Sequence, residues 1–182
     1  MDDINPLFLK IGEAAANQKG DNFLPGSGRA VITQCIYNPA ANDGPTFIAR
    51  FKILESKSKE ELALGKANPP GARVGWPQKL AKFKSAMGNV KAMVLNTLGY
   101  KEADVSKEDF ARAFNGIVSK NQPFRGMLLD YDTYQQQVKS GDNKGKWNTY
   151  VRFTHVPATG GNSPEDVAKR RAELDVSDPI VG

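Results

Sequence analysis

Basic and aromatic side chains recur at outward positions of the predicted strands, and this combination suits contact with single-stranded nucleic acid. Cationic side chains pair with the phosphates of such a strand, and exposed rings stack on its bases. Arg50 and Lys52 alternate with apolar residues within 47–54, so they project from the face opposite the core. Tyr150 and Arg152 share a face of the segment 147–154 in the same way. The candidate binding residues are Tyr37, Arg50, Lys52, Arg73, Trp76, Lys79, Lys82, Lys144, Lys146, Tyr150 and Arg152.

Each candidate also has a plainer interpretation. Lysines on outward strand faces are mostly solvated charges without a specific partner. Trp76 has the strand parity of Val74, and Trp147 has that of Val151, so either ring could be a core residue instead of a stacking surface. Both alternatives stay open at the level of sequence.

Residues able to catalyse a reaction are few and isolated. Cys35 lies among apolar residues, where a thiol is inert. His155 has no Ser or Asp partner near it in the sequence, although such partners can be distant in the chain. Asp130 and Asp132 share a strand face, which makes a two-carboxylate metal site conceivable, but no third acid lies nearby in the sequence. We therefore expect no enzymatic activity and no cofactor, with a metal-dependent nuclease as a less favoured alternative.

Length and composition indicate one globular domain of 182 residues with 40% hydrophobic and 25% charged residues. The net charge of +5 permits a polyanionic partner without requiring one. The single cysteine excludes an internal disulfide, and the single histidine excludes a histidine-rich metal site. The apolar runs are too short for a membrane span, and the N-terminus lacks a secretory pattern. We therefore expect a cytoplasmic protein with no membrane partner.

Short strands and a helical insert should position the candidate residues. Helical spacing of apolar residues is found over 83–98, and Ser106 fits the N-cap of a second helix that reaches Ile117. Strands are predicted at 29–37, 47–54, 72–77, 124–131 and 147–154. This order predicts a mainly β fold, a five-stranded OB-fold barrel with a helical insert between strands three and four. Other small β-barrels and α+β sheets also have five strands.

The two ends of the chain differ from this central part. Residues 1–27 are predicted to form a lead-in, 28–157 the OB-fold domain, and 158–182 a mildly acidic, flexible C-terminal tail. The tail has little apolar periodicity, so it should bury little surface.

Several short motifs between residues 22 and 156 resemble OB-fold single-stranded DNA-binding proteins of bacteriophages. The motifs are residues 22–26, the spacing of 47–56, Val74-x-Trp76, the segment 88–99 and the late strand 147–153. The resemblance implies sequence-tolerant binding and protection of single-stranded DNA in phage replication or recombination, without catalysis, in the host cytoplasm. Many such proteins recruit replication or recombination proteins through an acidic tail with a hydrophobic tip, of which 175–182 is a weak version.

A different class of protein also fits the basic surface. A virion structural protein, or a protein that interacts with host factors, could use the same cations to meet an acidic protein. The salt dependence of oligonucleotide binding distinguishes this class from a nucleic-acid binder.

Overall fold

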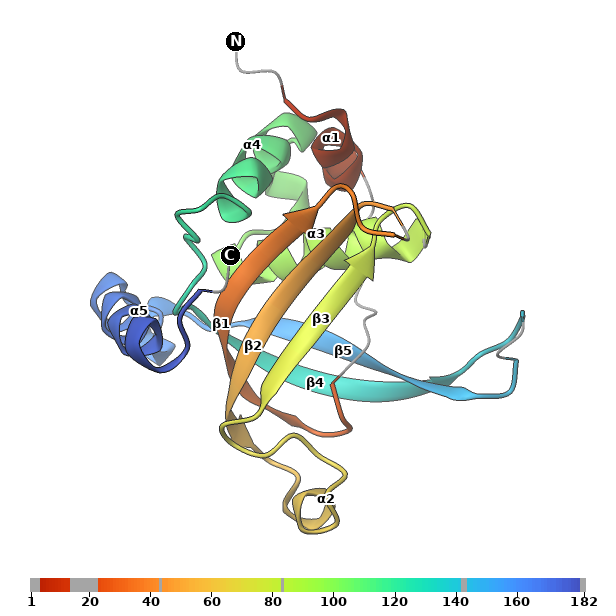
Figure 1. Ribbon diagram of the computed structural model, residues 1–182, viewed down its shortest axis with the longest axis vertical. Coiled ribbons are helices and arrows are strands. Elements are labelled where there is room, and N and C mark those ends of the chain that lie inside the picture. Colours follow the sequence, from red (N-terminus) through yellow and green to blue (C-terminus); the bar gives the residue numbers. More distant parts are fainter. Residues whose placement is uncertain (1–3, 14–22, 43, 83, 142–143, 181–182) are drawn as a thin grey trace.

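The computed structural model of the protein describes residues 4–13, 23–42, 44–82, 84–141 and 144–180. Within these ranges the chain forms a five-stranded antiparallel sheet with the order β3-β2-β1-β4-β5 (Figure 1). The strands are β1 (Ser27–Asn38), β2 (Thr46–Ser56), β3 (Arg73–Lys79), β4 (Leu128–Gln137) and β5 (Trp147–His155). The predicted mainly β architecture with five strands is confirmed, although β4 begins at Leu128 and not at residue 124.

The sheet is open, with β3 and β5 at its two edges, and it does not close into the barrel that the element order had predicted. Strand β1 gives the sheet its bend, because it pairs with all of β2 but only its first residues, 27–31, pair with β4. Its register with β2 shifts between Arg29 and Ala30 and again between Ile32 and Gln34. Such irregularities bend a strand and increase its twist. As a result β4 and β5 pass behind β1, β2 and β3 (Figure 1), and the core lies between the two halves.

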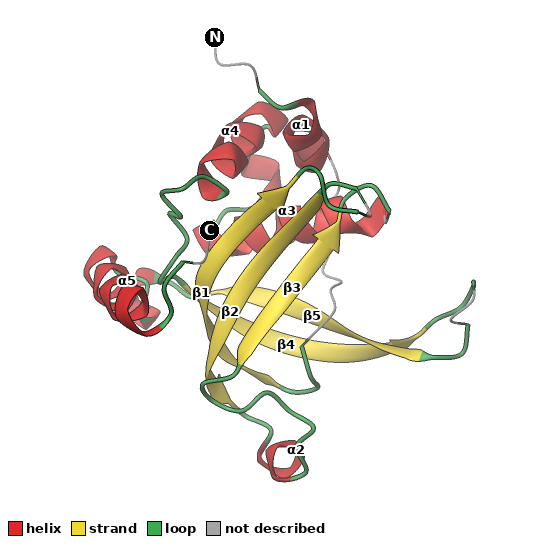
Figure 2. Ribbon diagram, viewed as in Figure 1, coloured by secondary structure: helices red, strands yellow, loops and turns green. Residues whose placement is uncertain are grey.

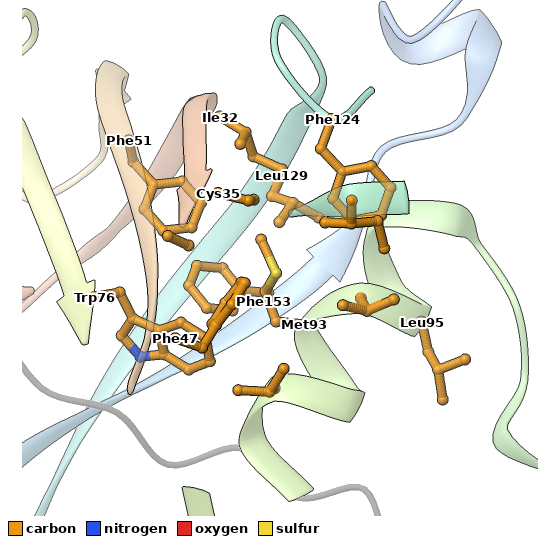
Figure 3. Packing of buried hydrophobic residues seen from close by; sticks show 14 of the residues in the cluster. Ile32, Cys35, Phe47, Phe51, Trp76, Met93, Leu95, Phe124, Leu129 and Phe153 are labelled. Atoms are coloured by element: carbon orange, nitrogen blue, oxygen red, sulfur yellow. The ribbon is translucent and has the colours of Figure 1, made fainter. Parts of the chain in front are cut away.

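Side chains from both halves of the sheet meet in an aromatic core. On β2 the alternating residues Phe47, Ala49, Phe51 and Ile53 are buried, which confirms the predicted core face of this strand. Figure 3 shows Phe51 of β2 directed toward the same interior as Phe153 of β5. Their rings stack with centroids 5.2 Å apart, so aromatic contact joins parts of the sheet that are distant in strand order.

Helices cover one end of the sheet (Figure 2). They are α1 (Pro6–Glu13), α3 (Lys84–Leu98) and α4 (Lys107–Ile117), with a 3₁₀ turn at Glu102–Asp104. The short helix α2 (Lys59–Ala63) lies at the opposite end of the sheet, in the connection between β2 and β3 (Figure 2). The predicted cap of α4 is confirmed, because Ser106 Oγ accepts a hydrogen bond from the Asp109 amide at 3.1 Å. The predicted stop of the preceding helix is also confirmed, since Gly99 follows α3 with φ +72°. Phe83, placed in that helix by the sequence pattern, and Asn22 of the first motif lie outside the described residues.

The segment predicted as an N-terminal lead-in contributes helix α1 to the core. Phe8 and Ile11 of this helix are buried, and the ring of Phe8 meets Phe114 of α4 edge-on at 4.8 Å. The apolar residues that begin the chain therefore anchor α1 against α4. None of the described helices combines the length and apolar character needed to cross a bilayer.

The C-terminal segment forms helix α5 (Pro164–Ser177), after a 3₁₀ turn at Ala158–Gly160, so the expectation of a flexible tail was wrong. Ser163 caps the helix by accepting a hydrogen bond from the Asp166 amide at 3.2 Å. Leu174 is buried in a small cluster with Val31 of β1 and Leu128 of β4. The sequence pattern missed the helix because Leu174 is its only buried residue, and one buried residue gives no apolar stripe.

Candidate nucleic-acid interface

The outer face of β2 and β3 has exposed cations in register with one another. Arg50 lies opposite Gly75, and Lys52 lies opposite Arg73 in the antiparallel ladder. Arg50 and Arg73 are exposed and Lys52 is half-buried, while Phe51, between Arg50 and Lys52 in the sequence, is in the core. The predicted orientation of β2 is therefore confirmed, and it places three positive charges on one side of two neighbouring strands.

A pocket of about 350 Å³ opens on this outer face. Arg50 stands at its rim and donates from Nη1 to the side-chain oxygen of Gln34 at 2.9 Å. The floor comes from the sheet, and one wall comes from the C-terminal segment that follows α5. The lining residues are Thr33, Gln34, Arg50, Phe51, Arg73, Val74, Gly75, Arg125, Asp178, Pro179 and Ile180.

Arg125 holds the C-terminal wall in place. The side chain is 1% exposed, and its Nη1 donates to the Thr33 carbonyl of β1 at 2.6 Å. On the other side Nε donates to Asp175 at 2.8 Å, and Nη2 donates to the Asp178 carbonyl at 2.8 Å. These charge-assisted bonds tie the last turn of α5 to the sheet. Sequence reasoning missed Arg125, because a single arginine between apolar residues gives no pattern that distinguishes a buried anchor from an exposed charge.

Arg73 carries a second link between the sheet and the C-terminal segment. Its Nε lies 3.3 Å from a carboxylate oxygen of Asp178, and its Nη2 donates to the Ser177 carbonyl at 3.2 Å. The Arg73 side chain nevertheless remains 65% exposed. An exposed ion pair of this kind contributes little to stability, so a competing anion can reach the guanidinium at small cost.

The hairpin of β4 and β5 extends beyond the body of the molecule (Figure 1). Lys144 and Lys146 are exposed near its tip, and Trp147 begins β5 with 64% of its surface exposed. Trp147 has the strand parity of the buried Phe153, but it lies past the end of the core. The open alternative for this residue is thereby decided in favour of an exposed ring.

Tyr134, Tyr150 and Arg152 form a cluster on the opposite face of the same hairpin. Tyr134 and Tyr150 are cross-strand partners with ring centroids 5.5 Å apart. The Arg152 guanidinium carbon lies 4.4 Å from the centroid of the Tyr134 ring, which is a cation–π geometry. Tyr134 was missed from the sequence, although its position opposite Tyr150 follows once the hairpin register is known.

Two predicted stacking rings belong to the core and must be removed from the interface. Trp76 is 1% exposed and meets Phe47 and Phe153 edge-on at 6.4 and 5.3 Å. Tyr37 is half-buried, and its ring contacts Phe8 of α1 at 5.1 Å. Both rings face the interior because their positions on β1 and β3 have core parity. A base cannot stack on the Trp76 ring without displacing a packed neighbour, and the Tyr37 ring is partly covered by Phe8.

Lys79 and Lys82 lie at the far end of β3, near the turn into α3. Lys79 is half-buried opposite Thr46, and Lys82 is exposed. Both residues also interact with other parts of the protein. Apart from Tyr37 and Trp76, the structure therefore separates the predicted residues into three groups, which are the outer face of β2 and β3, the end of β3 and the β4–β5 hairpin.

The residues considered as potential catalytic groups are buried or lie beside hydrogen-bond partners within the fold. Burial raises the pKa of the Cys35 thiol to about 12, so the thiolate is not populated near neutral pH. His155 Nδ1 lies 3.1 Å from the Asn96 carbonyl. Asp130 accepts two bonds from Arg29, at 2.7 and 3.1 Å. The part of the chain that the structure describes contains no group of three or more His, Cys, Asp or Glu residues arranged to hold a metal ion.

The surface that remains can contact an anionic chain in two ways. The outer face of β2 and β3 offers cations and a pocket, and the hairpin offers cations together with the exposed ring of Trp147 and the half-buried rings of Tyr134 and Tyr150. Phosphates pair with the cations of both surfaces, and bases stack on the rings of the hairpin. Comparisons with profiles of known protein families, with curated proteins and with solved structures give no match.

Proposed function

We propose that the protein binds single-stranded DNA with little sequence preference and protects it. The observation that carries the proposal is the placement of Arg50, Lys52 and Arg73 side by side on one outer sheet face, together with the exposed ring of Trp147 on the β4–β5 hairpin. Cations along a groove and rings accessible to bases are the two requirements of a sequence-tolerant single-strand binder.

The strand order supports the finer part of the proposal, an OB-like fold. The connectivity of β1, β2, β3, a helical insert, β4 and β5 is that of an OB-fold, with pairing of β1 to both β2 and β4. We propose an OB-like sheet in which side-chain packing takes the place of the pairing between β3 and β5. In such a fold the face of strands two and three and the loop between strands four and five surround the ligand, and both carry cations here.

The motifs shared with bacteriophage single-stranded DNA-binding proteins support a role in phage replication or recombination, in the cytoplasm of a host cell. In that role the protein would coat exposed strands and keep them unpaired without cleaving them. Val176 and Ile180 remain 87% and 42% exposed, so they are the residues through which the C-terminal segment would recruit a replication or recombination protein.

The test is a titration of the purified protein with fluorescent oligo-dT of several lengths and with a duplex of the same length. We expect tighter binding to the single strand, and an affinity that falls with salt by a slope of about 0.7 per phosphate contacted. Equal affinity for both, or no binding to either, would contradict the proposal. Cleavage of the oligonucleotide in the presence of Mg²⁺ would instead support the nuclease alternative.

A further inference from the structure

The outer face of β2 and β3 offers phosphates a partner but offers bases no ring. Its outward positions are all described, and none of them is aromatic. They are Ile48, Arg50, Lys52, Leu54, Arg73, Gly75, Pro77 and Lys79. A strand held on this face must therefore place its bases against another apolar surface or leave them in water.

The pocket on this face supplies such a surface. Its lining includes Arg50 and Arg73 from the sheet, together with Pro179 and the half-exposed side chain of Ile180 from the C-terminal segment. A lining that combines cationic and apolar groups suits a nucleotide, because the phosphate is charged and the faces of the base are apolar. A volume of about 350 Å³ also lies within the range of small-molecule sites.

Gly75 keeps the middle of the pocket open. It lies opposite Arg50, and a Cβ atom built at this position meets no atom within 4 Å. Its φ does not fall in the left-handed region, so the backbone does not require glycine. The absence of a side chain at Gly75 therefore leaves space beside the strand for a ligand, although the backbone conformation would allow another residue there.

We infer that this pocket holds one nucleotide unit, with its phosphate on Arg50 and Arg73 and its base between Gly75 and Ile180. The inference rests on the proposed function and adds to it a defined subsite in which the C-terminal segment is one wall. Arg125 makes the wall firm enough for this purpose, because its hydrogen bonds fix the backbone at Asp178 beside Pro179. The Asp178 carboxylate opposes the phosphate by sharing Arg73, so this charge should weaken nucleotide binding.

The test adds a side chain at Gly75 to occupy the open space of the pocket. Gly75→Leu places a branched side chain in the open space, and Gly116→Leu is the matched control, because Gly116 lies on the exposed face of α4 and also has no atom within 4 Å of a built Cβ. The probes are thymidine monophosphate, oligo-dT and an abasic oligomer of the same length. Thermal melting of both variants verifies that the fold is retained.

We expect Gly75→Leu to weaken binding of thymidine monophosphate by about tenfold or more, while Gly116→Leu leaves it unchanged. Ile180→Ala should weaken binding of the monophosphate by about tenfold through lost apolar contact, yet leave the abasic oligomer unaffected. Asp178→Asn should strengthen binding of every probe that carries a phosphate.

The outcomes distinguish failure of the nucleotide subsite from failure of single-strand binding. Normal affinity of Gly75→Leu for both thymidine monophosphate and oligo-dT would overturn the nucleotide subsite while leaving single-strand binding in place. An equal loss of the abasic oligomer and oligo-dT in Ile180→Ala would also overturn it, because the wall would then not contact the base. Absence of oligo-dT binding by the unaltered protein would overturn the proposed function itself.

Discussion

The indole ring of Trp76 on β3 meets the ring of Phe153 on β5 edge-on, with centroids 5.3 Å apart. These two strands are the edges of the sheet, and no hydrogen-bonded ladder connects them in the described ranges. Side-chain packing therefore holds together two edges that a closed barrel would join through its backbone. The contact makes Trp76 a structural residue, whereas Trp147 at the start of β5 is exposed.

Replacing Trp76 with alanine should destabilise the protein by about 3–5 kcal/mol, because the variant loses apolar burial and leaves a cavity between the two halves of the sheet. Urea unfolding followed by circular dichroism measures the change. A loss of less than about 1 kcal/mol would mean that Phe47 and Phe51 close the gap without the indole ring.

Replacing Trp147 with alanine should leave the free energy of unfolding within about 0.5 kcal/mol of its original value, because the ring is exposed. Binding of oligo-dT should weaken by about 1–3 kcal/mol if one base stacks on this ring. Quenching of tryptophan fluorescence by oligo-dT should also be smaller in this variant. Unchanged affinity together with unchanged quenching would exclude Trp147 from the interface.

Alternating substitutions along β2 should separate binding from stability. Arg50→Ala and Lys52→Ala should each weaken oligo-dT binding and lower the salt slope by about 0.7, since each removes one phosphate partner. Phe51→Ala should instead cost about 3–5 kcal/mol of stability, because its ring is buried between them. Salt titrations and thermal melting of the three variants test this. A destabilised Arg50→Ala variant with a native Phe51→Ala variant would reverse the assignment of faces.

Removing the Arg125 guanidinium should loosen the C-terminal segment. Arg125→Ala leaves the buried Thr33 carbonyl without its donor, at a cost of about 1–3 kcal/mol. Arg112→Ala is the matched control, because Arg112 also pairs with an aspartate, Asp109, but both side chains are 66% exposed. That control should change stability by less than about 0.5 kcal/mol. Limited proteolysis should cleave near α5 in the Arg125 variant alone, and equal resistance of both variants would contradict the anchoring role.

The thiol of Cys35 should resist alkylation in the folded protein and react only after unfolding. Its pKa of about 12 exceeds the ordinary value of 9.0, so between these pH values the unfolded chain releases a proton that the folded chain retains. Because only the unfolded state loses this proton, the thiol lowers the free energy of unfolding as pH rises through this window. Below the window it has no effect. Cys35→Ala should remove that part of the alkaline loss. Rapid labelling with iodoacetamide at pH 8 under native conditions would show that the thiol is accessible.

Patterns that follow directly from backbone geometry were predictable from the sequence. The alternation on β2 identified its core face, and Ser106 identified the start of α4, since both signals depend only on residues close in the chain. Parity could not distinguish Trp76 from Trp147, because both occupy core-facing positions and only the extent of the core along the strand decides their burial. How far a hairpin extends beyond the core depends on tertiary packing, which the local sequence does not determine.

The C-terminal half of the candidate site was not predictable for a related reason. Helix α5 has one buried apolar residue, and it is held by bonds from Arg125 and from Arg170, whose Nε donates to the Gly126 carbonyl at 2.7 Å. These bonds join residues far apart in the chain, so no local sequence pattern predicts them. The pocket exists only after α5 has docked, and its wall could not be placed from the sequence.

The contacts of Arg125 also determine the order in which the chain can assemble. Its acceptors are 92 residues earlier at Thr33 and 50 and 53 residues later at Asp175 and Asp178. Docking of α5 therefore needs β1 already in place and residues 175–178 already outside the ribosome. During synthesis the central sheet can form first, with its cationic outer face uncovered, and the segment that follows α5 covers one side of it only once residues 175–178 have emerged.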